Sequence, residues 1–313
     1  MKNRRIGIIG RHDDPEVQLL KARIEDLGAE AIVIDFWHYP RFTQSEISMD
    51  RVLYDGIDLT RLDAFYLRQL GYFSPLPQKE FTRQEWDAYY EKFNEFIANE
   101  REVMSYRESL IQMLETIRPV INPYFCAFYH KLKLYQYWKL NRAGLPVPDF
   151  VAGNDYSELK RFASENQTVG KPMMGGYVRL LDEGMLESER SMLRKRPIIA
   201  QRRISGRMLR CFVLADRILG TCELVHKPDE TDARLGIVAM ERFELAPEFG
   251  MTALKAAQTL GMIFAGVDLV LDEATSSIYV LECNPAPLYR SFEAQTGLPI
   301  SHELAGYLVN EAS

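Results

Sequence analysis

The first third of the chain shows short apolar runs separated by a helical pattern of polar and apolar residues. Apolar runs at residues 5–10 and 31–36 predict two strands. Between them, Asp14 can cap a helix that has Pro15 at its first position. A third strand is predicted at residues 62–68, LDAFYLR. This strand–helix–strand order predicts a βαβ unit and an opening α/β domain.

The next segment, residues 82–118, contains neither proline nor glycine and has aromatic residues at steps of three and four. These residues are Trp86, Tyr89, Tyr90, Phe93 and Phe96. The spacing favours an amphipathic helix, or a pair of helices, packing on the sheet over an aromatic ligand-binding cluster. A short strand at 120–123 and a helix over residues 125–144 are predicted to follow.

Strand-length apolar runs dominate the second half of the chain and predict several strands there. Helices are predicted at 157–166, 248–261 and 302–310. The runs that predict strands lie at residues 169–172, 198–202, 209–214, 218–225, 265–271 and 278–284.

The last predicted hairpin, residues 265–284, concentrates oxygen-bearing side chains. If it folds about Thr275, Asp268 lies opposite Glu282. Asn284 shares the face of Glu282, because side chains alternate along a strand. Two carboxylates and an amide oxygen suit Mg²⁺, which prefers hard oxygen ligands and bridges to phosphates. Taken alone, the same residues also fit an acidic hairpin with no ligand.

Composition narrows the class of protein. The chain has 313 residues, enough for two or three lobes, with 47% hydrophobic and 26% charged residues, as in soluble globular proteins. The formal charge of −6 gives no general attraction to nucleic acid. No apolar run approaches the roughly 18–20 residues of a membrane helix, and MKNRRIGIIG reads as a first strand, not a signal peptide. A cytoplasmic protein with no membrane partner is therefore expected, and its four cysteines, Cys283 included, are expected to be reduced and to point into the core.

Several cations precede the acidic hairpin. Lys133 lies in a predicted helix, Lys171 precedes a glycine-containing loop (MMGG), and Arg210 lies in a predicted strand. Cations, a flexible loop and a magnesium site are what nucleoside triphosphate chemistry requires. Neither a Walker sequence nor the kinase HRD and DFG motifs occur, so a nucleotide site must be of another kind. Residues 190–210 are also rich in arginine, which fits either a solvated surface or contacts to phosphates or an acidic substrate.

In this order, the segments KLKLYQYWKLNRAGLPVP, VGKPMMGG, IIAQRRISGRMLRCFVL, AGVDLVL and YVLECNP resemble the ATP-grasp superfamily. They are similar to RimK-type glutamate ligases and, more so, to microviridin-type peptide ligases that make graspetides. The likeness runs from about residue 60 to the end of the chain. It implies an ATP-grasp fold: a Rossmann-like α/β N-terminal domain (residues 1–122), followed by a central α+β lobe (123–200) and a C-terminal α+β lobe (201–313) that enclose ATP.

The resemblance also implies roles for individual residues. It gives Arg210 and Arg234 catalytic roles and makes Mg²⁺, with Mn²⁺ as an alternative, the ion held by Asp268, Glu282 and Asn284. Residues implied to bind ATP are Lys133, Lys171, Gly175, Gly176, Gln201, Arg202, Arg203 and Ile204. The implied reaction is ADP-forming ligation of a carboxylate to an amine or hydroxyl through an acyl phosphate. The implied partner is a peptide, protein or amino-acid substrate, and such ligases often form homo-oligomers.

The chain departs from the RimK-type pattern at two positions and in one loop. Arg202 replaces a usual glutamate and Leu209 a usual aspartate, and KPDETDARLG replaces the RSNxxRGG loop. These differences keep a second hypothesis open, that of a non-catalytic ATP-binding sensor or partner subunit.

Overall fold

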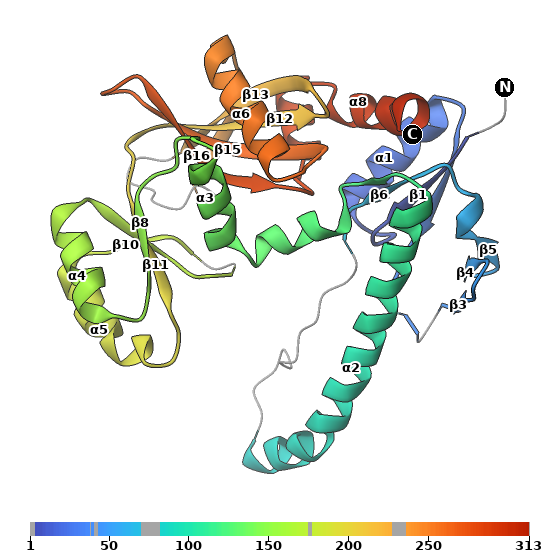
Figure 1. The fold of residues 1–313 in the computed structure, drawn as a ribbon, viewed down its shortest axis with the longest axis horizontal. Coiled ribbons are helices and arrows are strands. Elements are labelled where there is room, and N and C mark those ends of the chain that lie inside the picture. The colour runs from blue at the N-terminus through green and yellow to red at the C-terminus, as the bar shows by residue number, and fades with distance from the viewer. Residues whose placement is uncertain are drawn as a thin grey trace. The chain divides into compact units, whose positions relative to one another are not determined.

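The computed structural model describes residues 4–37, 39–40, 43–69, 82–174, 177–226 and 236–312. The chain divides into two compact units (Figure 1), with Met1–Tyr124 and Leu304–Ser313 in the first and Phe125–Glu303 in the second. The second unit contains most of both predicted ATP-enclosing lobes. The finer boundaries at residues 122 and 200 stay predictions.

The first unit is built on the predicted βαβ arrangement. Strands β1 (Arg5–Ile9) and β2 (Glu30–Ile34) are parallel and joined by α1 (Pro15–Asp26). The Asp14 carboxylate caps α1 by accepting a hydrogen bond from the Glu16 N–H, as predicted. The full sheet has the order β2-β1-β6-β7, with β6 at Ala64–Leu67 and β7 at Val120–Ile121.

A small antiparallel sheet in this unit was not predicted. It contains β3 (Ser45–Ile47), β4 (Val52–Tyr54) and β5 (Ile57–Asp58), followed by the 3₁₀ helix η1 (Leu59–Arg61). Strands of two or three residues are too short to give a clear alternation of polar and apolar positions.

The aromatic segment forms one long helix, α2 (Arg83–Ile117), which begins with a capping box between Thr82 and Glu85. Among its residues whose burial is described, the fully buried apolar ones, Leu110, Ile111 and Leu114, lie near its C-terminal end. The prediction of a helix is confirmed. Phe96, one of the aromatic residues behind the predicted packing face, is 38% exposed, so the buried face lies further along the helix than predicted.

The prediction of one helix over residues 125–144 is wrong. A 3₁₀ helix, η2 (Tyr124–His130), comes first, and α3 (Lys133–Arg142) starts after a break at Leu132. The first segment, YFCAFYH, consists largely of aromatic, cysteine and histidine residues, which have weaker helix propensity than the Lys, Leu and Gln residues of α3.

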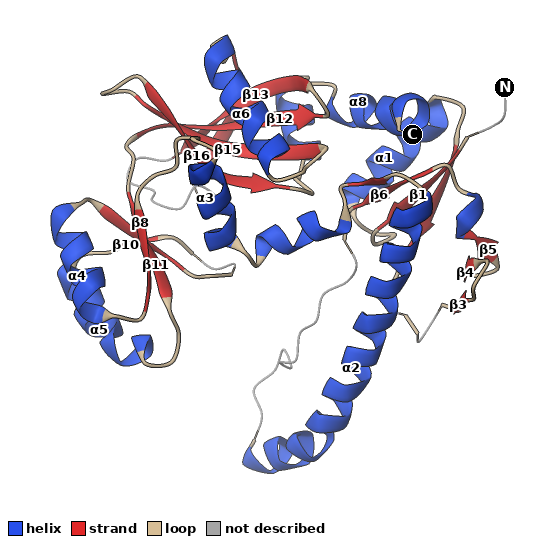
Figure 2. Ribbon diagram, viewed as in Figure 1, coloured by secondary structure: helices blue, strands red, loops and turns tan. Residues whose placement is uncertain are grey.

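The second unit contains a four-stranded sheet of order β10-β9-β11-β8. Helices α4 (Tyr156–Glu165) and α5 (Glu183–Leu193) pack side by side over one face of it (Figure 2). Their core includes Leu159, Leu186 and Ala200. Helix α5 and strand β10 were not predicted. The strands are β8 (Phe150–Gly153), β9 (Thr168–Lys171), β10 (Arg179–Leu180) and β11 (Ile198–Arg202).

A five-stranded antiparallel sheet, ordered β14-β13-β12-β15-β16, completes the second unit. One face carries buried residues such as Leu209, Val267 and Val280, which pack against α3 and α6 (Pro247–Thr259). The opposite face carries the candidate site. The strands are β12 (Gly206–Leu214), β13 (Arg217–His226), β14 (Ile237–Phe243), β15 (Phe264–Asp272) and β16 (Ser277–Asn284).

The chain ends in α7 (Arg290–Thr296), α8 (Ile300–Gly306) and a π-helical turn, η3 (Tyr307–Glu311), where one helix over 302–310 was predicted. All four cysteines are buried and free of disulfides, as predicted. Within the described ranges, the structure contains no helix with both the length and the apolar character needed to cross a membrane.

Candidate functional site

The hairpin of β15 and β16 brings its two carboxylates together as predicted. Asp268 and Glu282 are cross-strand partners, and Asn284 is paired with Gly266 on the same face. Near the turn, however, the pairing is shifted by one residue relative to that of Asp268 with Glu282, because Leu269 pairs with Val280. A β-bulge at residue 281 absorbs the difference. The bulge turns Glu282 and Asn284 to the face of Asp268.

Arg210 on β12 is the cross-strand partner of Asp268 on its other side. Its guanidinium donates two hydrogen bonds to that carboxylate, Nε to Oδ1 at 2.6 Å and Nη2 to Oδ2 at 3.0 Å. The same guanidinium lies 5.1 Å from the ring centroid of Phe292 on α7. Burial alone would lower the pKa of Arg210, but the Asp268 charge and hydrogen bonds outweigh it and raise that pKa. Arg210 is therefore fixed as a cation.

Lys133, the first residue of α3, supplies the second cation. Its Nζ lies 3.8 Å from Glu282 Oε2, and its side chain is 12% exposed. The helix is held there by Gln136, which is buried, with 1% of its surface exposed. Gln136 Nε2 donates to the Cys283 carbonyl at 3.1 Å, and its Oε1 accepts from the Cys283 N–H at 2.6 Å. These two hydrogen bonds, called the Gln136 clamp below, fix α3 against the edge of β16. Because Lys133 lies three residues before Gln136 on the same face of the helix, the clamp directs Lys133 toward Glu282.

These contacts define the charged cluster, composed of Lys133, Arg210, Asp268 and Glu282. Each carboxylate faces one cation, so the cluster has balanced charge. In the described residues, no three His, Cys, Asp or Glu side chains gather into a metal site. The predicted set instead has two carboxylates and the Asn284 amide. Such a set fits Mg²⁺, which usually keeps water and substrate phosphate oxygens among its ligands.

Asn284 lies at the end of β16, where its Oδ1 accepts a hydrogen bond from the Ala286 N–H at 3.3 Å. Beside it, Gly266 has room only for a hydrogen, since a Cβ there would lie 2.8 Å from Pro287 Cβ. Cys283 points into the core as predicted, and burial raises the pKa of its thiol well above the ordinary value. It is a neutral core group beside the cluster.

The other predicted nucleotide residues that the structure describes lie in strands β9 and β11 or directly after β11. Lys171 ends β9 and pairs with Ile199 on β11, while Gln201 is buried two residues further on. The N–H groups of Arg202 and Arg203 donate to the carbonyls of Asp149 and Gln167. Two N–H groups of the predicted nucleotide-binding segment 201–204 are therefore already hydrogen-bonded to carbonyl groups within the chain.

The Arg202 side chain reaches from β11 to the site face of the other sheet. Its Nε lies 3.3 Å from Asp149 Oδ2, and its guanidinium lies 5.3 Å from the centroid of the Tyr279 ring. Leu209, the other departure from the family pattern, is fully buried on the opposite face of β12 from Arg210. An aspartate there would place an ionised group in an apolar core.

Three further predicted residues, Gly175, Gly176 and Arg234, lie outside the described residues. Sequence reasoning missed three residues that hold the charged cluster. These are Gln136, Phe292 and Gly266. Of these, only Gln136 could have been noticed in the sequence, because it is a polar residue on the inward-packing face of the helix, one turn after Lys133.

Comparison with known proteins gives the following likenesses. Residues 181–308 match the model of the RimK-like ATP-grasp domain. A "Probable alpha-L-glutamate ligase" of Stutzerimonas stutzeri is 30% identical over 191 residues. That match covers 57% of this chain and 62% of the relative, so the chain spans less than two thirds of its length.

Two solved structures are similar over nearly the whole chain. The ATP-grasp ligase PsnB, complexed with a minimal precursor, Mg and ADP, is 26% identical with a TM-score of 0.83, covering 99% of this chain and 98% of that one. The macrocyclase MdnC of Microcystis aeruginosa, bound with precursor peptide MdnA, is 18% identical with a TM-score of 0.78, covering 98% of this chain and 100% of that one. At 18% identity, the likeness to MdnC shows a shared fold and no more.

Proposed function

Since the chain has the ATP-grasp fold and contains a RimK-like ATP-grasp domain over residues 181–308, we propose that it is an ADP-forming carboxylate ligase. Its substrates would be ATP and a peptide, protein or amino-acid-like molecule. The product would be an amide or an ester formed through an acyl phosphate.

The charged cluster is the observation that carries this proposal. Two carboxylates lie side by side on neighbouring strands, each facing a cation from a different element. Asp268, Glu282 and Asn284 would hold Mg²⁺, whose chemistry is to bridge phosphate oxygens and neutralise their charge. Arg210 and Lys133 are then available to contact phosphate oxygens. Phosphoryl transfer depends mainly on such positioning and charge neutralisation.

The chemistry would proceed in two balanced steps. A substrate carboxylate oxygen attacks the γ-phosphorus of ATP, the bond to the β–γ bridging oxygen breaks, and ADP leaves. An amine nitrogen or hydroxyl oxygen then attacks the acyl carbon, phosphate leaves, and the attacking group loses a proton. Arg210 would stabilise the negative charge of the transferred phosphoryl group through its rigid fork of N–H donors.

The likeness to PsnB supports a peptide substrate, because that protein is complexed with a minimal precursor in one structure and with precursor peptide PsnA2 in another, and the match extends over nearly the whole chain. The likeness to the Stutzerimonas protein supports the addition of free glutamate as a second candidate. ADP release should be measured with glutamate alone and with candidate precursor peptides. Turnover on glutamate without any peptide would reject the peptide-ligase form of the proposal.

The general proposal is tested by substituting the metal ligands. We expect Asp268→Ala together with Glu282→Ala to abolish Mg²⁺-dependent ATP binding, measured by calorimetry, and ADP formation, measured by a coupled assay. Glu273→Ala is the matched control, since Glu273 is an exposed carboxylate in the turn of the same hairpin. Hydroxylamine should trap the acyl phosphate as a hydroxamate in the wild type.

Unchanged ADP formation in the double variant would refute the metal site. Tight ATP binding with no hydroxamate or ADP across many acceptors would instead support the non-catalytic sensor. Arg202, which motivates that alternative, already has Asp149 and Tyr279 as partners within the chain.

A further inference from the structure

Helix α3 has two stripes of side chains with the same spacing, shifted by two residues. The inner stripe consists of Lys133, Gln136, Tyr137 and Leu140, of which the last three are buried. The outer stripe consists of Tyr135, Trp138, Lys139 and Arg142. Steps of three and four residues place side chains on one face of a helix. A shift of two residues turns the direction by about 200°, so the outer stripe points away from the core and from the charged cluster.

The outer stripe belongs to a ladder of aromatic rings that is open to solvent. Tyr135 is 41% exposed and Trp138 is 57% exposed, and their rings stack with centroids 6.3 Å apart. Tyr135 also stacks on Tyr129 at 6.3 Å, and Phe125, which is 51% exposed, packs edge-on against Tyr129 at 5.6 Å. Because neighbouring rings hold one another in place, a partner that covers them restricts few additional side-chain rotations.

The two cations of the outer stripe lie over these rings. Lys139 Nζ lies 5.9 Å from the centroids of Tyr129 and Tyr135, and the Arg142 guanidinium lies 5.6 Å from that of Trp138. In the described ranges, both cations contact rings and Lys139 donates to the Tyr129 hydroxyl, but neither pairs with a carboxylate. Residues 124–148 contain no aspartate or glutamate, although the whole chain has a formal charge of −6.

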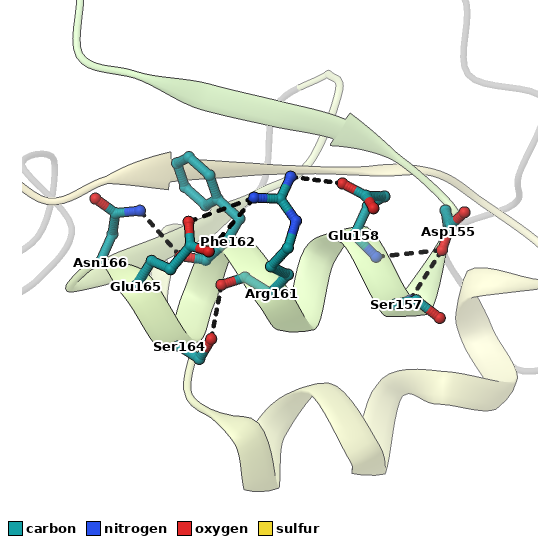
Figure 3. Close-up of polar contacts among 8 residues, drawn as sticks. All are labelled: Asp155, Ser157, Glu158, Arg161, Phe162, Ser164, Glu165 and Asn166. Carbon is teal, nitrogen blue, oxygen red and sulfur yellow. Dashed lines mark hydrogen bonds and ion pairs between the residues drawn. The ribbon is translucent and has the colours of Figure 1, made fainter.

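Helix α4 provides a contrast within the same unit. Figure 3 shows Arg161 paired with Glu158 and Glu165, which lie three residues before it and four after it. Such pairs neutralise the cations of a solvated helix face with carboxylates of the same helix. The outer stripe of α3 has the cations without the carboxylates, and it adds exposed rings. It therefore suits a partner that brings both carboxylates and apolar side chains.

We propose that the outer stripe of α3 and the adjoining Phe125 form a docking site for an acidic amphipathic helix of a partner protein. This surface is called the α3 docking face below. Trp, Tyr and Arg, three of its residue types, dominate the binding energy at many protein interfaces. An amphipathic helix recognises such a face through side chains three and four residues apart.

The spacing within the α3 docking face matches that of a helical partner. Tyr135 and Trp138 are three residues apart, and so are Lys139 and Arg142. Positions i and i+3 of a partner helix lie at the same separation. A helix that runs along α3 can therefore cover the two rings with one pair of apolar side chains and face the two cations with a pair of carboxylates.

Docking on this face does not depend on the proposed ligase activity. Lys133 and Gln136 belong to the inner stripe, so a partner on the outer stripe leaves their contacts with β16 in place. We expect saturating partner peptide to leave the affinity for ATP unchanged. ADP release measured in parallel separates the two proposals, because peptide binding without any turnover would leave the docking face standing and reject the ligase.

The experiment compares three labelled alanine-rich helical peptides by fluorescence anisotropy on the full chain. The first carries two Leu and two Glu on neighbouring faces, each pair three residues apart. The second has Glu on the face opposite Leu, and the third has Lys in place of Glu. We expect the first to bind at least about tenfold more tightly than the others, the scale of one charge-assisted contact. Equal binding of all three, or no binding of the first up to about 1 mM, would overturn the proposal.

Variants locate the binding on α3. Trp138→Ala, and separately Lys139→Glu with Arg142→Glu, should each weaken binding of the first peptide by about tenfold or more. The double charge reversal should instead bind the Lys peptide. Trp138 is exposed, so its variant serves if the double variant fails to fold. Retained binding of the first peptide by Trp138→Ala and by the charge reversal would overturn the proposal.

The matched control is Arg161→Glu, which reverses an exposed cation on α4 and should bind the first peptide like the wild type. Sedimentation of the chain alone tests the other occupant, a second copy. Self-association that Trp138→Ala abolishes would overturn the proposal and assign the face to that copy. Tighter binding of a single-stranded oligonucleotide or of anionic vesicles than of the first peptide, lost in the same variant, would also overturn it.

Discussion

Arg210→Met should strengthen divalent-cation binding by the nucleotide-free protein while it impairs ADP formation. The reason is that Arg210 occupies both oxygens of Asp268, a predicted metal ligand. A cation that binds Asp268 must compete with this guanidinium. Methionine keeps much of the packing of the arginine stem against Phe292 but removes the charge and the donors.

The size of the effect follows from the two hydrogen bonds. A hydrogen bond to a charged group contributes about 1.5–3 kcal/mol. The Asp268 side chain is 22% exposed and that of Arg210 14%, so solvent screens part of this energy. A total of about 1.5–3 kcal/mol for the pair is a reasonable scale, and it corresponds to roughly a tenfold to hundredfold lower dissociation constant for the metal. Loss of a positioned phosphate contact should lower the rate of ADP formation by about 10²–10³.

Mn²⁺ binding followed by electron paramagnetic resonance measures the first effect, and a coupled assay measures the second. Arg207→Met is the control, because Arg207 lies on the same strand and pairs with Glu223, outside the charged cluster. Asp268→Asn should weaken Mn²⁺ binding. If Arg210→Met leaves Mn²⁺ affinity unchanged while Asp268→Asn lowers it, Arg210 does not compete with the metal and the reasoning fails.

Three further outcomes are expected. Gln136→Leu should lower the free energy of unfolding by about 2–4 kcal/mol, seen in denaturant titration, because it removes both hydrogen bonds to the Cys283 backbone; an unchanged midpoint would contradict the clamp. Gly266→Ala should lower the free energy of unfolding by about 1–3 kcal/mol in the same titration, because its Cβ would lie 2.8 Å from Pro287 Cβ. An unchanged free energy of unfolding would mean that the backbone around Pro287 can shift without cost. Burial raises the pKa of Tyr54 to about 12, above that of the unfolded chain, so its contribution to stability should be complete below about pH 10 and lost between about pH 10 and 12. Tyr54→Phe should make the alkaline fall in the unfolding midpoint shallower, and an identical pH profile would contradict this assignment.

Periodicity identified the elements that are long or strongly apolar. The βαβ unit, α2 and most strands of the five-stranded sheet lie where the pattern predicts them. Strand β10 has two residues and α5 is a polar helix with few buried residues, so neither has a distinct signal. The break before α3 escaped detection because aromatic residues continue the helical spacing through it.

The sequence allowed us to predict which residues form the candidate site better than how those residues contact one another. Asp268 and Glu282 could be paired because both flank one short turn. The pairing of Arg210 with Asp268 depends on the order of strands in the sheet, which local patterns do not specify. The clamp from Gln136 joins residues 147 positions apart and is a property of the packed structure.

The bulge at residue 281 decides which side chains of β16 face the charged cluster and which face the core. On the turn side of it, Ile278 and Val280 face the core, whereas beyond it Cys283 faces the core and Glu282 does not. Deleting residue 281 would remove the bulge and leave a regularly alternating strand, in which Glu282 still faces Asp268 and Cys283 still faces the core. Straightening the strand with residue 281 retained would instead send Glu282 inward and Cys283 outward. A one-residue gap at 281 in a comparison of relatives is therefore compatible with the same ligand set, and paired insertions in the turn at 272–277 would also leave these faces unchanged.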